Sequence, residues 1–256
     1  MPPIIRLEKV SYSYESEGLP SVRALDGVSL AIEQGEYVVI LGHNGSGKST
    51  LAKHLNALLL PSGGDVWVRD WNTRDLRHTL DIRRTVGMVF QQPDNQIVAT
   101  IVEEDVAFGP ENLRLSMEEI DKRVKESLAN VGLTNLENQH PYELSGGQQR
   151  RLAIAGVLAM KPQMIIFDEP FNGLDYEGVV QTLQQIVQLH QNGHTILVIT
   201  HDLEKVLAHA TRLCIMQQGD IRLDGLPEEV LSHVEKYSVK RPSPSQRLIE
   251  TMTWLR

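Results

Sequence analysis

Apolar positions along this chain follow two spacings in turn, which predicts strands and helices in alternation. Short apolar runs bounded by turn residues are typical of buried parallel strands. Earlier in the chain, alternating apolar residues within 7–10, 28–32 and 66–68 predict strands with one buried face. The predicted buried strands are Tyr37–Leu41, Thr85–Phe90, Met164–Phe167 and Thr195–Thr200.

Between these strands the apolar spacing becomes helical. A helix is predicted over Gly47–Leu59, because Leu51, Leu55, Leu58 and Leu59 share one face. A second runs from about Glu177 to Gln191 and ends at Asn192-Gly193. Because strands and helices alternate, we expect a parallel sheet covered by helices. The helical stretch from about residue 93 to 158 is then an insertion between core strands.

One helix within that insertion has a clear start and end. Ser116 and Glu119 fit a capping box, and Gly132 stands where a C-terminal cap glycine belongs. The apolar positions between them recur at helical spacing: Met117, Ile120, Val124, Leu128 and Val131.

Composition narrows the class of protein. The 256 residues carry a net charge of −8 and a pI near 5.6, which argues against a general nucleic-acid-binding role. The single cysteine, Cys214, lies in an apolar run and is expected to be a buried structural thiol. The sequence shows neither a signal peptide nor an apolar run near the ~20 residues of a membrane helix. We therefore expect a cytosolic chain whose membrane role, if any, comes through a partner.

A phosphate-binding loop follows the first predicted buried strand. Its backbone must curl around an anion, which glycines allow, and the following helix N-terminus adds partial positive charge. Lys48 is expected to reach the β- and γ-phosphates, and the Ser49 hydroxyl to bind Mg²⁺. The motif G-x-x-x-x-G-K-[ST] is filled by Gly42, His43, Asn44, Gly45, Ser46, Gly47, Lys48 and Ser49, and Thr50 follows it.

A second element of nucleotide chemistry is the strand Met164–Phe167, which ends in Asp168 and Glu169. The carboxyl ends of strands in such sheets face the ligand. Asp168 would hold Mg²⁺ through water, and Glu169 would orient or deprotonate the attacking water.

Leu144-Ser145-Gly146-Gly147-Gln148 adds a resemblance to ATP-binding-cassette (ABC) ATPases, which covers about Ile4 to Asp224. The resemblance implies an α/β fold: a P-loop NTPase with a RecA-like parallel sheet core, an N-terminal antiparallel β subdomain and an inserted α-helical subdomain. It implies an ATPase domain over 1–226, with the helical subdomain at about 93–158, and a helical tail over 227–256. In the family, Ser145, Gly146, Gly147 and Gln148 would close over ATP held by another subunit.

The same resemblance assigns further residues. Gln91 matches the Q-loop glutamine that touches Mg²⁺, Asp175 the D-loop aspartate that bridges subunits, and His201 the switch histidine on the γ-phosphate. Tyr14 matches the aromatic that stacks on adenine, with Tyr12 as an alternative. The expected ligands are ATP and Mg²⁺.

One segment departs from the family pattern. The family usually reads Pro-Thr-[Ser/Ala]-Gly-Leu-Asp-Pro around the D-loop, whereas here Phe171 and Tyr176 replace the threonine and the last proline. The catalytic acid is retained, so hydrolysis is expected, while the contact between subunits is open.

Within the family, two stretches are similar to ATPases of energy-coupling factor (ECF) importers of vitamins, cobalt or nickel. They are residues 86–96, which contain Pro93-Asp94-Asn95-Gln96, and residues 102–112. That branch implies a second ATPase subunit, identical or paralogous, under a membrane scaffold protein that holds a substrate-binding membrane protein. The chain would then lie at the cytoplasmic face of the cell membrane as a peripheral subunit. The alternatives are another ABC importer, a soluble ABC ATPase of DNA repair or translation, and a regulatory subunit with little turnover.

The tail has a character of its own. Pro227 is expected to open a short helix, and residues 241–244, Arg-Pro-Ser-Pro, to break the chain before a last helix over Ser245–Arg256. That helix would pack either on its own core or on the partner ATPase. Its apolar stripe is Leu248, Ile249, Met252 and Leu255, with Trp254 beside it.

Overall fold

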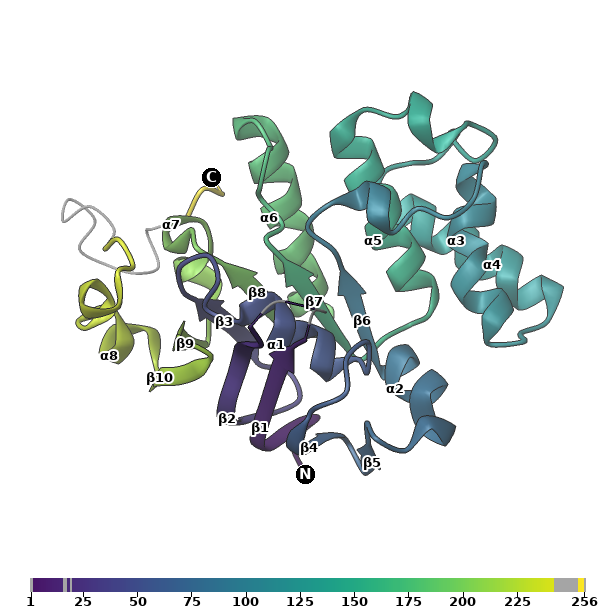
Figure 1. Cartoon of the computed structure of the whole chain (residues 1–256). Coiled ribbons are helices and arrows are strands. Elements are labelled where there is room, and N and C mark those ends of the chain that lie inside the picture. Colours follow the sequence, from purple (N-terminus) through teal and green to yellow (C-terminus); the bar gives the residue numbers. More distant parts are fainter. Residues whose placement is uncertain (1, 16–17, 19, 242–252, 256) are drawn as a thin grey trace.

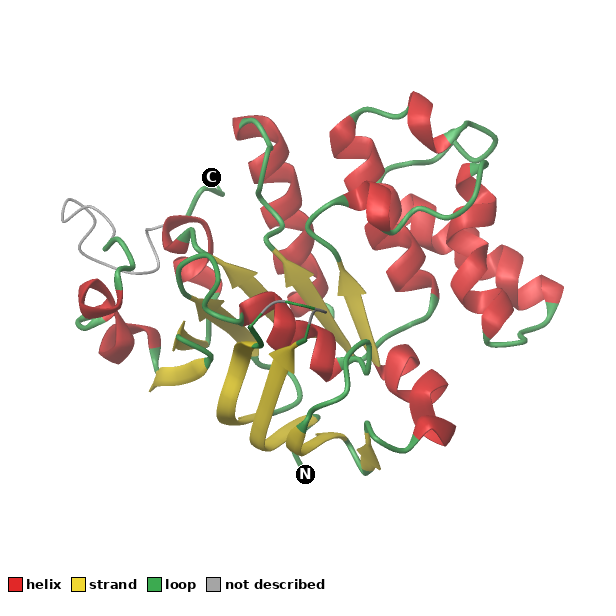
Figure 2. Cartoon of the chain, in the orientation of Figure 1, coloured by secondary structure: helices red, strands yellow, loops and turns green. Residues whose placement is uncertain are grey.

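The computed structural model describes the chain except residues 1, 16–17, 19, 242–252 and 256. Its centre is a six-stranded sheet in the order β10-β9-β3-β8-β7-β6, parallel except for the edge strand β10 (Figures 1 and 2). The strands are β3 (Tyr37–Leu41), β6 (Val86–Val89), β7 (Met164–Asp168), β8 (Thr195–Thr200), β9 (Arg212–Gln217) and β10 (Asp220–Gly225).

A second, antiparallel sheet lies beside the first and has the order β2-β1-β4-β5. It supplies the expected N-terminal subdomain, and with the parallel core it confirms the predicted α/β fold class. Its strands are β1 (Ile5–Tyr14), β2 (Val22–Ile32), β4 (Gly63–Val68) and β5 (Trp71–Asn72).

Helices cover the parallel sheet, and α3, α4 and α5 form a group to one side of it (Figure 1). The α-helices are α1 (Lys48–Leu55), α2 (Thr79–Thr85), α3 (Val102–Asn112), α4 (Met117–Asn130), α5 (Gly146–Ala159), α6 (Tyr176–Gln191), α7 (Leu203–Val206) and α8 (Pro227–Leu231). Short 3₁₀ turns are η1 (Leu76–His78), η2 (Pro93–Asn95), η3 (Pro141–Glu143), η4 (Leu207–His209) and η5 (Val234–Tyr237). Along the described part of the chain, no helix is both long and apolar enough to cross a membrane.

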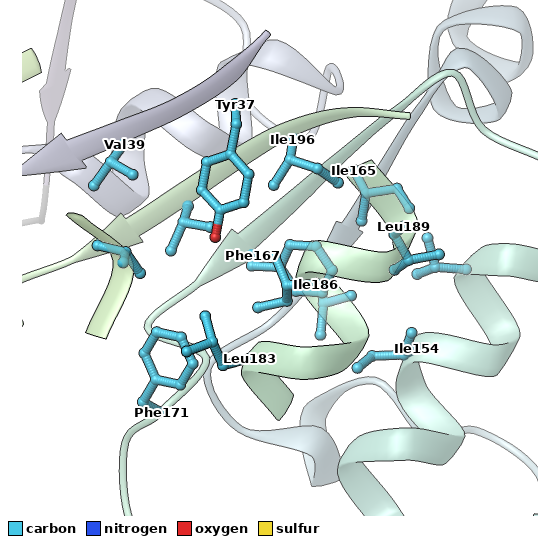
Figure 3. Close-up of a cluster of buried hydrophobic side chains, with 14 of the residues drawn as sticks. Tyr37, Val39, Ile154, Ile165, Phe167, Phe171, Leu183, Ile186, Leu189 and Ile196 are labelled. Atoms are coloured by element: carbon cyan, nitrogen blue, oxygen red, sulfur yellow. The ribbon is translucent and has the colours of Figure 1, made fainter. Parts of the chain in front are cut away.

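The alternation of side chains along the central strands divides the core between the two faces of the sheet. In β3, Val38 and Ile40 face α1 and the antiparallel sheet, whereas Tyr37, Val39 and Leu41 face the other side. Figure 3 shows this second face, where Tyr37, Phe167 and Ile196 from the strands meet residues of α5 and α6. All five residues of β3 and of β7 are buried, so the carboxyl ends of these strands are held firmly.

Two predictions about the ends of helices need correction. The helix predicted over Gly47–Leu59 ends at Leu55, because Ala57 has φ +55° and the amides of Leu58 and Leu59 return to the Lys53 carbonyl. Leu58 is 40% exposed rather than on the buried face. At α4, Ser116 caps the helix by accepting from the Glu119 amide at 3.3 Å, but the reciprocal capping box occurs at Ser145 and Gln148 instead.

Other predicted features are confirmed. Gly132 follows the end of α4 with φ +67°, Gly193 follows α6 with φ +93°, and α8 begins at Pro227. Cys214 is fully buried, and burial raises the pKa of its thiol well above the ordinary value.

Most of the predicted last helix lies outside the described residues, including Leu248, Ile249 and Met252. Thr253–Leu255 have no regular secondary structure, so the predicted helix does not extend over them, and Trp254 and Leu255 pack against the core instead.

Candidate functional site

The loop between β3 and α1 is shaped by glycines at three positions. Gly45 and Gly47 have φ of +81° and +103°, a conformation that side chains with a Cβ rarely adopt. A Cβ at Gly47 would also overlap the Ala24 carbonyl oxygen, and one at Gly42 would overlap that of Met216. The loop therefore requires glycine at position 45 for its conformation, at position 42 for space, and at position 47 for both reasons.

Lys48, the first residue of α1, folds back under this loop. Its Nζ donates to the carbonyl oxygens of Gly42 at 2.7 Å and of His43 at 3.0 Å. Burial lowers the pKa of the ammonium, and the nearby carboxylates of Glu169 and Asp168 oppose that shift. The hydrogen-bond partners of Nζ are neutral carbonyl oxygens, so its charge is available to bind an anion.

Ser49 joins the loop to the end of β7. Its Oγ donates to Asp168 Oδ1 at 2.9 Å, and burial raises the pKa of that carboxyl group. A hydroxyl and a carboxylate side by side are the hard oxygen donors that Mg²⁺ prefers, so this pair fits the expected ion.

Glu169 follows at the strand end with φ +47°, which is unusual for a residue with a side chain. Its amide donates to the Ile199 carbonyl at 2.8 Å. Its carboxylate accepts from Thr200 Oγ1 at 3.2 Å and lies 3.0 Å from His201 Nδ1. Strained conformations of this kind persist where the surrounding structure imposes them, and they cluster at functional sites.

These elements surround one cavity of about 290 Å³. It brings Gln91 and His201, which are 110 positions apart in the sequence, to the same opening as the loop. Its lining residues are Asn44, Gly45, Gly47, Lys48, Ser49, Thr50, Gln91, Glu169, Asn172 and His201.

Other predicted residues surround the loop without lining the cavity. The Tyr14 hydroxyl lies 3.2 Å from Thr50 Oγ1, and the Tyr14 ring is 41% exposed. Tyr12 packs edge-on between Tyr14 and His54, which leaves Tyr14 the more accessible of the two. Within the loop, the His43 Nδ1 lies 2.7 Å from the Asn44 carbonyl oxygen, and Ser46 is fully buried.

The residues Ser145–Gln148 start α5, outside this cavity. Ser145 Oγ accepts from the Gln148 amide and Gln148 Oε1 accepts from the Ser145 amide, while a Cβ on Gly146 or Gly147 would meet open space. Asp175 caps α6 by accepting from the Gly178 amide at 2.8 Å. Neither helix start lines the nucleotide cavity of its own chain.

Comparison with known proteins agrees with this geometry. Residues 25–172 match the ABC transporter family. The energy-coupling factor transporter ATP-binding protein EcfA1 of Caldanaerobacter subterraneus subsp. tengcongensis is 51% identical over 91% of this chain and 84% of its own length. EcfA of Methanosarcina acetivorans is 48% identical over 90% and 82%. The chain belongs to the ATP-binding subunits of energy-coupling factor ABC transporters.

Solved ABC structures support the same assignment. CbiO1 from Clostridium perfringens, described as part of the ABC transporter complex cbiONQ, superimposes with a TM-score of 0.80 and 37% identity over 92% of this chain and 93% of its own. A dimeric ATP-binding cassette bound to ADP and Pi in a post-hydrolysis state gives 0.78 and 34% over 87% and 98%. This ABC ATPase therefore binds and hydrolyses ATP.

Arg150 is a site residue of this ABC ATPase that the sequence analysis missed. Arg150, in the first turns of α5, is buried and donates to the carbonyl oxygens of Pro170, of Gln91 at 3.3 Å and of Asn172 at 3.2 Å. It thus joins α5 to the Q-loop at Gln91 and to the segment after Glu169. Arg150 shares the buried helix stripe of Ile154, and a lone charge on an apolar stripe is the signal that could have revealed it.

Proposed function

We propose that this chain powers an energy-coupling factor importer by binding ATP in the cavity beside the phosphate loop and hydrolysing it with Glu169. The observation that carries the proposal is the cavity itself. It gathers the Lys48 ammonium, the Ser49–Asp168 pair and the Glu169–His201 pair around one space.

In this proposal the loop holds the triphosphate. Backbone N–H groups of Gly42–Thr50 and the start of α1 bind phosphate oxygens, and Lys48 supplies charge to the β- and γ-phosphates. Ser49, Asp168 and Gln91 hold Mg²⁺, which neutralises phosphate charge when bound. Tyr14 stacks on the adenine at the rim.

Glu169 orients the attacking water and accepts its proton. The contacts with Thr200 and His201 fix the direction of this carboxylate, so the proton acceptor is positioned before the substrate arrives. In the same arrangement His201 is exposed enough to reach a γ-phosphate, as its side chain is 56% accessible.

Two subunits complete the site. The Ser145–Gln148 segment of one subunit closes over the triphosphate of the other, and Asp175 meets the partner beside it. The open space around Gly146 and Gly147 supports this role, since a phosphate can approach their backbone closely. The partner is a second copy or a paralogous ATPase.

Coupling to the membrane passes through Gln91 and the following turn, η2. Gln96 connects this turn to α5, because its side chain accepts from the Phe90 amide at 3.1 Å and donates to the Ala153 carbonyl at 2.9 Å. Asp94 is exposed and has no comparable internal contact among the described residues. A substitution at Asp94 therefore tests coupling at the surface of the turn, and a substitution at Gln96 tests coupling through the internal contact with α5.

We expect Asp94→Ala to reduce transport while basal ATP hydrolysis of the isolated subunit is retained. Gln96→Ala should reduce transport too, with some loss of hydrolysis because α5 loses one of its connections to the Q-loop. Both rates are measured in the reconstituted transporter and in the isolated subunit. Equal losses of transport and basal hydrolysis in Asp94→Ala would rule out the coupling role.

The remaining partners are an integral membrane scaffold and a substrate-binding membrane protein, with the ATPase at the cytoplasmic face of the membrane. The cargo, a vitamin or a cobalt or nickel ion, contacts the membrane proteins and not this chain. Affinity purification of the tagged chain after detergent extraction tests the assembly. We expect an integral scaffold protein and a small substrate-binding protein in fixed stoichiometry, and purification of the ATPase alone would count against it.

A further inference from the structure

The described end of the chain lies on the segment that surrounds the D-loop. The Trp254 ring stacks on Tyr176, with ring centroids 5.4 Å apart and planes inclined by 29°. The Lys205 ammonium lies 5.5 Å from the centre of the Trp254 ring and 5.6 Å from that of Phe171. Trp254 and Phe171 are thus joined through one cation.

Further contacts fix this arrangement in place. The Thr253 hydroxyl lies 2.9 Å from His209 Nε2, and Trp254 and Leu255 pack on the core cluster that contains Phe171 and Leu207. These contacts are made within one subunit, so Trp254 and Leu255 pack on their own core.

The residues around Trp254, which we call its receptor, are connected to the strand end at Glu169 and to His201, the two sides of the catalytic edge. Phe171 stands two residues after Glu169 and next to Asn172, which lines the nucleotide cavity. Lys205 forms an ion pair of 2.6 Å with Asp202, the residue after His201. The D-loop segment, which contains Phe171 and Tyr176, and the switch segment, which contains His201 and Lys205, are therefore held together by aromatic and cation–π contacts.

This arrangement gives a reason for the two departures from the family pattern. Phe171 and Tyr176 stand where a threonine and a proline are usual, and both belong to the receptor of Trp254. We propose that Trp254 is a positioning residue for ATP hydrolysis: it clamps the D-loop and the switch segment of its own subunit, and Phe171, Tyr176 and Lys205 are its receptor. This inference goes beyond the proposed function, because it concerns how the catalytic edge is held.

Kinetics of the full-length chain test the clamp. Trp254→Ala should lower kcat for ATP hydrolysis about two- to tenfold, the range of one aromatic contact, and leave KM for ATP unchanged. Trp254→Phe should restore most of kcat. The matched control is Trp71→Ala, which removes an indole stacked on His78 at 5.8 Å on the antiparallel sheet and should change neither constant. An unchanged kcat in Trp254→Ala overturns the proposal.

A double-mutant cycle with Tyr176→Pro identifies the receptor. Tyr176 is 62% exposed and is the first residue of α6, where proline is well tolerated. If Trp254 acts through Tyr176, then Trp254→Ala should reduce kcat less in the Tyr176→Pro background than in the parent. Strictly additive effects overturn the assigned receptor.

A spectroscopic readout separates this proposal from the general mechanism. In protein labelled with 5-fluorotryptophan, the Trp254 resonance is assigned by its loss in Trp254→Phe. We expect it to shift when Mg-ATP is added to the Glu169→Gln variant, in which hydrolysis is blocked. A binding-competent protein whose Trp254 resonance stays unchanged overturns the clamp, while failure to bind ATP would overturn the assigned nucleotide site instead.

Discussion

The phosphate loop and the catalytic edge at Glu169 face the same cavity, but they are held in different ways. In the loop, Lys48 is fixed by contacts with its sequence neighbours Gly42 and His43. Glu169 is fixed by Thr200 and His201, which come 31 and 32 residues later. Phosphate binding by Lys48 is therefore a local property of the loop, whereas hydrolysis depends on distant parts of the fold. Substitutions should be able to separate the two.

The largest expected effect is on hydrolysis alone. Glu169→Gln keeps the size of the side chain but removes the proton acceptor, so turnover should fall by roughly 10²–10⁴, the usual contribution of a positioned base. ATP binding should persist, and the protein should accumulate as a closed ATP-bound dimer. Steady-state ATPase assays of the assembled transporter and sedimentation with ATP measure the two properties. Near-normal turnover would remove Glu169 from the mechanism.

The converse substitution acts on binding. Lys48→Ala removes the charge under the loop, and loss of charged hydrogen bonds should weaken Mg-ATP binding about 10–100-fold, with hydrolysis lost as a consequence. Lys161→Ala is the control, because it removes an ammonium 3.5 Å from Glu119 on the helical side of the molecule. Calorimetric titration compares the variants, and equal affinities for Lys48→Ala and the parent would contradict the assigned phosphate loop.

Arg150 tests whether the catalytic edge depends on distant contacts. Arg150→Ala leaves the Pro170, Gln91 and Asn172 carbonyls without their donor, which should lower the free energy of unfolding by about 1–3 kcal/mol. We expect kcat to fall about tenfold, an effect of the size seen when a supporting contact is lost, with KM little changed. The adjacent Arg151→Ala removes a donor to Gln181 and serves as the control. A normal kcat in Arg150→Ala would mean that the edge is held without this residue.

The same contrast explains what the sequence could predict. The phosphate loop, the acids at the end of β7 and the starts of α5 and α6 are contiguous motifs. Their residue spacing was enough to predict them, because the residues of each motif are neighbours in the sequence. Arg150 and the receptor of Trp254 could not be predicted in this way. Their contacts join positions such as 91, 150 and 172 or 171, 205 and 254, which only the folded chain brings together.

The apolar spacing also did not predict the backbone conformation at the end of α1. The helix after the phosphate loop was predicted to continue to Leu59, because Leu58 and Leu59 keep the apolar spacing of the turns before them. Ala57 instead takes a left-handed conformation, a choice that apolar periodicity does not reveal. The roles of the individual site residues and the boundary at 226 remain predictions.

The smallest expected effect isolates the conformation of the loop. Gly45 and Gly193 have φ of +81° and +93°, and a Cβ on either would meet no atom within 4 Å. Gly45→Ala and Gly193→Ala should therefore each lower the free energy of unfolding by a similar amount, about 1–2 kcal/mol, the cost of a left-handed residue with a side chain. Only Gly45 lines the nucleotide cavity, so only Gly45→Ala should also weaken ATP binding. Chemical denaturation gives the first quantity and calorimetry the second. If both variants bind ATP like the parent, the loop tolerates a change in its backbone, and the local character of phosphate binding argued above is wrong.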